Sequence, residues 1–165
     1  MEVFLISEKT LKTNHINDNV SSEYIRPAIQ TAQEIGLQSI IGTNLYKKLI
    51  DKVENDDVSG YYKELLDDYI TPYLTYKVLS DIQIPLAFKN RNAGVVQTNN
   101  EYMNNTYMKD VQTIMDFYDQ KASFYAIRMS DWLCANSSNI PEYNITNNGD
   151  LPKDRDGYNT NIYLE

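Results

Sequence analysis

The chain has 165 residues, 42% of them hydrophobic and 23% charged, which suits one soluble domain with a substantial core. Its formal net charge of −8 argues against a protein that grips nucleic acid through its outer surface, because phosphates are bound by Lys and Arg. The single cysteine excludes an intrachain disulfide. The sequence also shows no long apolar run and no secretory signal, which argues against membrane insertion or export.

We predict an all-α protein in three parts. An N-terminal arm is expected over residues 1–20, where "EVFLIS" is a strand candidate and the following residues show no clear period. A helical body is expected over 21–135, as a bundle of about four main helices, the last of them long. A short β-hairpin is expected inside the body at 86–99, and an extended C-terminal tail over 136–165.

The first helix of the body is predicted to begin at Ser21 or Ser22, because either hydroxyl can accept from a free helix N–H. Its apolar positions recur with helical spacing: Tyr24, Ile25, Ala28, Ile29, Ala32 and Ile35. Gly36 follows directly and is expected to end the helix, which leaves "LQSIIG" as a short linking turn.

Two further helices are predicted from caps and periodicity. Thr43 is expected to cap a second helix, whose buried stripe is Leu45, Tyr46, Leu49, Ile50 and Val53. Ser59 is expected to cap a third helix, which carries an apolar pattern as far as Ile82. Pro72 lies inside that pattern and is expected to kink the helix or divide it, and Pro85 is expected to end it.

The polar stretch after the third helix is longer than the usual connection of about 4–6 residues. "LAFKNR" and "VVQTN" are predicted to pair as the hairpin around a turn at 92–94. An isolated hairpin is only marginally stable in water, so we expect it to gain order by pairing with another chain. Arg91, Val95 and Val96 are therefore candidates for contacts between subunits.

The fourth helix has the clearest pattern in the chain. Its apolar residues are spaced alternately three and four apart: Met108, Val111, Met115, Tyr118, Ala122, Tyr125, Met129 and Trp132. A helix from about Asn100 to Ala135 would be about 50 Å long at 1.5 Å per residue. Bundle packing explains this seam, but a helix of that length is expected to project or to be covered by the arms or by another chain.

The tail is rich in Asn, Asp, Gly and Pro, and its composition predicts disorder in isolation. Its apolar residues are possible anchors on a neighbour, and Tyr158, Ile162 and Tyr163 are our interface candidates. The chain has 14 tyrosines, a residue type that is enriched at protein interfaces. We therefore favour the interpretation that they contact other chains over the alternative that they pack at the edges of the core.

Signals for chemistry are few. His15 is the only histidine and has no placed partner, so it is interpreted as solvent-exposed. Glu64, Asp67 and Asp68 could form a carboxylate pair for hydrolysis, but charge on the outer face of a helix explains them more simply. Cys134 is interpreted as a buried structural thiol. We predict no catalytic residues, no metal site and no cofactor.

Several of these features together resemble a known family. The markers are "LIS" followed by "INDNV", then "IRPAIQTAQE", then an "IG..LY..L" step, with a long last helix behind them. They resemble the head–tail connector proteins of tailed phages, and most of all those of phages and prophages of gut Bacteroidetes, including the crAss-like group. The likeness covers about residues 3–135 and does not include the tail.

The resemblance implies a ring, typically of twelve copies, docked under the portal protein and joined to the tail or to further neck proteins. Such a protein would be part of the virion, assembled in the host cytoplasm, with arms and hairpins embracing neighbouring subunits. The family carries no catalytic residues. The acidic balance of this chain fits a channel through which DNA passes without specific binding, because like charge removes electrostatic adhesion.

The leading hypothesis from the sequence is therefore a structural head–tail connector without enzymatic activity and without a membrane partner. The alternative is a stand-alone acidic helical protein that binds or regulates a basic partner. The two differ in oligomeric state, because the connector must self-associate or assemble on the portal and the alternative would be a stable monomer.

Overall fold

The computed structural model describes residues 3–14, 20–91, 94–97, 108–145 and 150–153. The described chain is mostly helical, which confirms the all-α prediction. Its elements are, in order, α1 (Glu8–Asn14), α2 (Ser22–Thr31), η1 (Ala32–Leu37), α3 (Gln38–Ile41), α4 (Thr43–Glu54), α5 (Gly60–Glu64), η2 (Leu65–Ile70), α6 (Thr71–Asp81), α7 (Gln83–Ala87), β1 (Phe88–Arg91), β2 (Gly94–Gln97), α8 (Met108–Ala135) and η3 (Pro141–Asn144). Among these, η1 and η2 are π-helical and η3 is a 3₁₀ turn.

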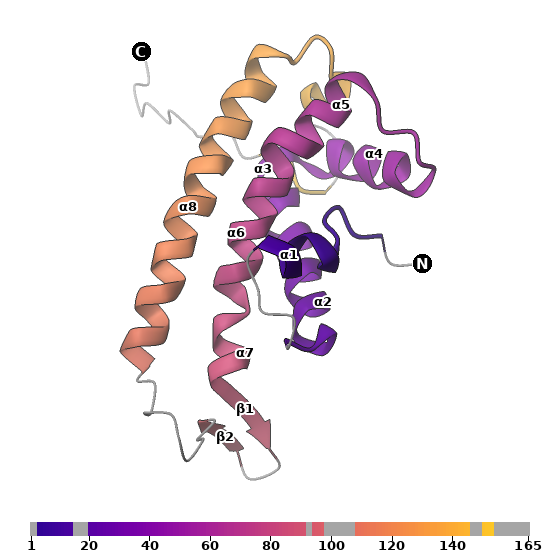
Figure 1. Cartoon of the computed structure of the whole chain (residues 1–165). Helices are drawn as coiled ribbons and strands as arrows, with labels where there is room; N and C mark the ends of the chain where they lie inside the picture. The colour runs from indigo at the N-terminus through magenta and orange to yellow at the C-terminus, as the bar shows by residue number, and fades with distance from the viewer. Residues whose placement is uncertain (1–2, 15–19, 92–93, 98–107, 146–149, 154–165) are drawn as a thin grey trace, which may run out of the picture.

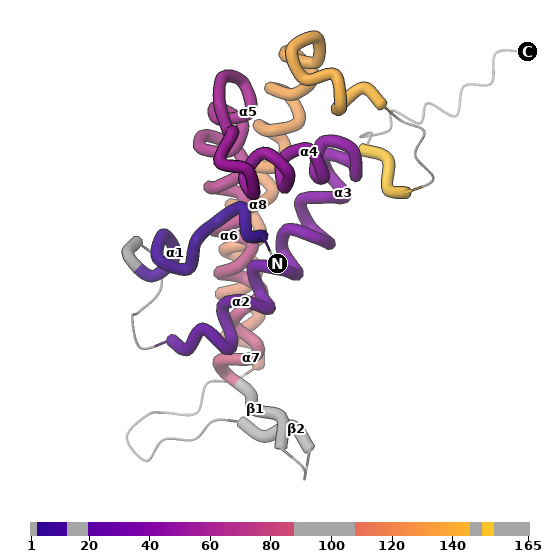
Figure 2. Tube along the Cα trace, turned by 90° about the vertical axis from the view of Figure 1, so that its right-hand side faces the viewer, coloured from indigo at the N-terminus to yellow at the C-terminus, as the bar shows by residue number. Residues whose placement is uncertain are grey.

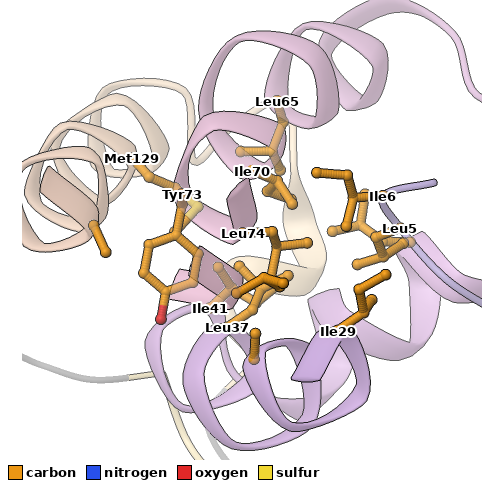
Figure 3. Packing of buried hydrophobic residues seen from close by; sticks show 14 of the residues in the cluster. Leu5, Ile6, Ile29, Leu37, Ile41, Leu65, Ile70, Tyr73, Leu74 and Met129 are labelled. Atoms are coloured by element: carbon orange, nitrogen blue, oxygen red, sulfur yellow. The ribbon is translucent and has the colours of Figure 1, made fainter. Parts of the chain in front are cut away.

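The helices form layers around α6 (Figure 1). The rod that runs from α5 through α6 to α7 lies antiparallel beside α8, and α2 lies on the other side of α6, as the view in Figure 2 shows from that side. Buried side chains from α2, η1, α3, η2, α6 and α8 meet between the layers (Figure 3). None of the described helices is long and apolar enough to cross a membrane.

The first helix of the body begins as predicted but ends elsewhere. Ser21 is its N-cap, and its side chain accepts from the N–H of Glu23 at 3.3 Å. Gly36 does not end the helix, contrary to the prediction, because the chain continues helically through η1 and α3 as far as Gly42. The residues predicted to be a linking turn are therefore helical.

The π-helical segment η1 changes which residues face the core. A π-turn holds one residue more than an α-turn, so the buried positions after it are shifted by one. Leu37 and Ile41 become fully buried, whereas Ile35, which the α-helical pattern places in the core, is 70% exposed. The prediction for Ile35 is thus wrong because periodicity alone carries no sign of the insertion.

The third helix is not divided at Pro72. The helical backbone runs from α5 through η2 into α6, and Thr71 keeps ordinary right-handed helical angles (φ −59°, ψ −47°) just before the proline. Pro72 lies in the first turn of α6, directly after the π-helical segment η2. A proline in the first turn of a helix is tolerated in spite of its missing N–H. Pro85 does not end the helical run either, since it lies in the first turn of α7.

The N-terminal segment packs on the body, and the prediction of an extended arm with a strand is wrong for residues 3–14. Gln33, itself buried, accepts from the N–H of Leu5 at 3.2 Å and donates to the carbonyl of Val3 at 2.9 Å. Leu11 on α1 is fully buried in the same core. Three large apolar residues of the segment, Leu5, Ile6 and Leu11, are thereby removed from water, which holds it in place.

The described part of the C-terminal tail also packs on its own chain, so the prediction of an extended tail is wrong for residues 136–145. Ile140 and Tyr143 are buried in the core cluster. Farther along, the carbonyl of Leu151 accepts from the N–H of Thr43 at 3.0 Å. Thr43 is the first residue of α4, and η3 also contacts α4, so the described tail is held against that helix.

The amphipathic pattern of the second helix is confirmed, and that of the fourth is confirmed except at Met108, which the heptad spacing places on the buried seam and which is 57% exposed. On α4, Leu45 and Leu49 are fully buried, and the other predicted positions pack against the core. On α8, the buried residues are Val111, Ala122, Met129 and Leu133. The described helix α8 has 28 residues and is about 42 Å long at 1.5 Å per residue.

Candidate subunit interface

Helix α8 packs only one of its faces on the body. The seam that contains Ala122 and Met129 lies against α6, to which α8 runs antiparallel (Figure 1). The opposite face of α8 points away from α6. A surface helix usually carries polar residues on such a face, so the apolar residues found there require an explanation.

Besides Met108 at its first residue, α8 exposes four large apolar side chains to solvent: Ile114 (42%), Phe117 (53%), Phe124 (61%) and Ile127 (59%). Their spacings of three, seven and three place them along one outward strip of the helix. We call this set the α8 stripe. Single exposed apolar residues are normal on protein surfaces, whereas a contiguous exposed patch commonly marks a site of interaction.

Grooves lie on both sides of Phe124. One, of about 410 Å³, is lined by residues that include Tyr76, Phe117 and Lys121. The other, of about 580 Å³, is lined by residues that include Asp116 and Ile127. Phe124 is thus a ridge between two hollows, a shape that side chains of another helix can fill.

The charges beside the α8 stripe differ between its two flanks. On one flank the ammonium of Lys121 lies 4.2 Å from the centre of the Phe117 ring, and the guanidinium of Arg128 lies 4.8 Å from that of Tyr69. Lys121 also lies 5.1 Å from the centre of the Tyr76 ring, so the rings of Tyr76 and Tyr69 hold the two cations against the body. On the other flank lie Asp116 and Asp119.

Predicted interface residues lie away from this stripe. Arg91 ends β1, and Val95 and Val96 lie in β2, which pairs antiparallel with β1. In that register Arg91 is opposite Gly94, Val95 opposite Asn90 and Val96 opposite Lys89. The other three candidates, Tyr158, Ile162 and Tyr163, lie outside the described residues, as does His15.

Two of the three carboxylates that are candidates for hydrolysis bind neighbouring side chains. Glu64 accepts from the indole N–H of Trp132 at 3.1 Å, and Asp67 pairs with Lys63 at 2.7 Å. Asp68 is exposed on η2. The hydrogen bond joins Glu64 to α8, where it orients Trp132, the only tryptophan of the chain.

Cys134 is exposed near the end of α8, so the prediction of a buried thiol is wrong. Its sulfur lies 3.8 Å from the hydroxyl of Tyr143, and burial raises the pKa of that tyrosine. The apolar run "DWLCA" misled the prediction, because Leu133 takes the core position and Cys134 falls on the next face of the helix.

Sequence reasoning missed the α8 stripe. The heptad seam of α8 is confirmed except at Met108, but Phe117, Phe124 and Ile127 form a second apolar pattern on the face opposite to it. The seven-residue spacing of Phe117 and Phe124, two helical turns, is the pattern in the sequence that indicates this second apolar face. Only the packing of the first seam on α6 decides which of the two faces remains in solvent.

Comparison with known proteins gives one match. The model of a family described as a family of unknown function (DUF6712) matches residues 37–153. No curated protein and no solved structure matches the chain. The matched region begins at the end of η1 and reaches the segment that contacts Thr43, so it includes α8 and its stripe.

Proposed function

The chain belongs to the DUF6712 family, and we propose that it is a structural protein of the phage virion. In this proposal it forms a ring, of twelve copies, that joins the portal of the head to the tail or to further neck proteins and extends the DNA channel. It acts by assembly and not by catalysis. The resemblance of residues 3–135 to head–tail connectors supports this proposal.

The observation that carries the proposal is the α8 stripe. Phe117 and Phe124 are more than half exposed on a helix whose other face is already packed on its own body. Removing such area from water is favourable by about 25 cal/mol per Å², so a stripe of this kind is stabilised by a partner. A subunit of a ring has such a partner on each side.

The packing of the termini changes what supports the proposal. The polar segments were expected to need a neighbouring chain for their order, but Leu11, Ile140 and Tyr143 are buried within one chain. Those segments therefore no longer argue for contacts between chains. The paired strands β1 and β2, expected to touch a neighbour through Val95 and Val96, stay a prediction within the proposal.

The net charge of −8 fits the proposed channel, because DNA that passes an acidic wall is not held by it. The same charge also suits the alternative function, an acidic helical protein that binds a basic partner as a monomer. Acidity therefore does not separate the two, and the test must address the place of the protein in the virion.

The test is to locate the protein within the virion. Virions of a phage that encodes this chain would be purified and imaged by electron cryomicroscopy, with mass spectrometry of the same particles. We expect the chain in the particles, as a ring between portal and tail into which the described helices fit. Virions that lack the chain, or that carry it outside the neck, would show that the proposal is wrong.

A further inference from the structure

A ring requires two different surfaces on each copy, because a head-to-tail contact joins one face of a subunit to another face of the next. The α8 stripe provides one such surface. The second must lie on another side of the molecule. Helix α2 meets this condition, since it lies on the side of α6 opposite to α8 (Figures 1 and 2).

The outward side of α2 and η1 carries a surface that suits the stripe in shape. Pro27, Thr31 and Ile35 are exposed and spaced four apart, so they form a ridge along the helix. Ile35 is 70% exposed and is placed there by the π-helical segment. Beside the ridge lies a groove of about 320 Å³, lined among others by Pro27, Thr31 and Pro85.

The same side is acidic. Glu23 and Glu34 are exposed on it, whereas Asp81, which lines the groove, contributes little negative charge because it is paired with Lys77 at 2.9 Å. Arg26 contributes little positive charge, because it is paired with Glu8 at 2.6 Å. We call Glu23, Pro27, Thr31, Glu34 and Ile35 together the α2 face.

Charge and hydrophobicity match between the two surfaces. The α8 stripe has two cations on one flank, Lys121 and Arg128, which are held over aromatic rings and not over carboxylates among the described residues. The α2 face offers Glu23 and Glu34. Opposite charges that flank an apolar contact raise the association rate and fix the register of the partners.

We propose that the α8 stripe of one copy packs on the α2 face of a second copy of this chain, in a head-to-tail contact. The partner is thus a second copy and not an unrelated helix. This inference rests on the proposed ring and specifies which surfaces close it. A contact between two α8 stripes would instead be isologous and would produce a dimer.

The first experiment removes the apolar part of the contact. Phe117→Ser with Phe124→Ser would be compared with the wild-type full chain by sedimentation velocity over a range of concentrations. We expect the wild type to associate beyond a dimer and the double variant to need at least tenfold higher concentration for the same extent. Met108→Ser is the matched control, because Met108 is 57% exposed on the same helix but lies outside the stripe.

The second experiment exchanges the charges. One variant carries Lys121→Glu and Arg128→Glu, and the other carries Glu23→Lys and Glu34→Lys. Each variant alone places like charges at every contact and should associate at least tenfold more weakly than the wild type. An equal mixture should recover association, because every contact in an alternating assembly again joins opposite charges. A single chain with all four changes should also recover it.

These experiments can overturn the inference. An unchanged assembly of the Phe117 and Phe124 variant, or an unchanged assembly of the Glu23 and Glu34 variant, would show that other surfaces are used. A wild type that stays monomeric at the highest concentration would show that the two surfaces do not bind each other. Circular dichroism must show that each variant is folded. None of these results decides the proposed function, which depends on the presence of the chain in the virion neck.

Discussion

Gly36 shows how one residue position depends on a neighbour from another helix. A Cβ atom at this position would lie 2.6 Å from the hydroxyl oxygen of Tyr73, a side chain buried in the core (Figure 3). The glycine therefore lies within a helix in spite of its low helix propensity, because the close approach of Tyr73 leaves no space for a side chain.

We expect Gly36→Ala to lower the free energy of unfolding by about 1 kcal/mol, because overpacking outweighs the gain in helix propensity. The measurement is urea denaturation followed by circular dichroism. The control is the same change in a Tyr73→Phe background, where the nearest remaining ring carbon is 3.6 Å from the new Cβ, an ordinary contact. There Gly36→Ala should be neutral or stabilising, and an equal loss in both backgrounds would contradict this account.

Glu8 links α1 to α2 and gives the N-terminal segment a dependence on pH. Its carboxylate accepts from the Ser22 hydroxyl and pairs with Arg26, and these contacts hold the pKa of Glu8 below its usual value of 4.5. Because the folded pKa is lowered, the stabilisation is present above pH 4.5 and is lost as the pH falls through the folded pKa.

Glu8→Gln should therefore lower the free energy of unfolding at pH 7 by less than about 1 kcal/mol, since Arg26 is mostly exposed and water screens the pair. The difference from wild type should shrink as the pH is lowered and disappear once Glu8 is protonated in the folded state. Denaturation curves at several pH values between 7 and 3 measure it. A difference that stays constant over this range would show that the charge of Glu8 is not involved.

At the scale of elements, Gly42 separates α3 from α4 and receives the C-terminal segment. Its backbone has φ +81° and ψ 156°, a region that residues with a Cβ atom avoid at a cost of about 1–3 kcal/mol. A Cβ there would also lie 2.8 Å from the backbone nitrogen of Lys153. The adjoining N–H of Thr43 donates to the carbonyl of Leu151.

We expect Gly42→Ala to destabilise the fold by at least about 1 kcal/mol and to release the segment at Leu151. Hydrogen exchange of the Thr43 amide under native conditions measures the release, and the rate should rise in the variant. Leu151→Ala is the control, because it trims a half-exposed side chain and keeps the accepting carbonyl. Unchanged exchange at Thr43 in Gly42→Ala would show that the segment is held by other contacts.

At the scale of the whole molecule, the N-terminal segment and α8 share one core, although they lie on different sides of α6. Leu11 is fully buried, and the core cluster that contains it also contains Met129 of α8. Trp132, the only tryptophan, packs on Tyr69 with ring centres 5.0 Å apart and reports on the α8 side of that core.

Leu11→Ala should therefore lower the stability of the entire molecule by about 2–5 kcal/mol, as expected for a cavity at a fully buried leucine. The measurement is the urea midpoint of Trp132 fluorescence, which should fall together with that of circular dichroism. Ile35→Ala, at a 70% exposed position, should change the stability by less than about 0.5 kcal/mol. A Trp132 transition unaffected by Leu11→Ala would mean that the N-terminal segment unfolds as a separate arm.

The sequence by itself determined the helical class, the start of the first body helix at Ser21 or Ser22, and the buried faces of α4 and, apart from Met108, of α8. These depend on spacing and capping within about one turn of chain, and such local patterns hold wherever the helix packs. The tertiary structure alone decided the course of η1 through Gly36, the burial of the segments around Leu11 and Tyr143, and the exposure of the α8 stripe. Each of these is set by contacts between residues far apart in the chain, and an apolar side chain carries no local mark of whether another element will cover it.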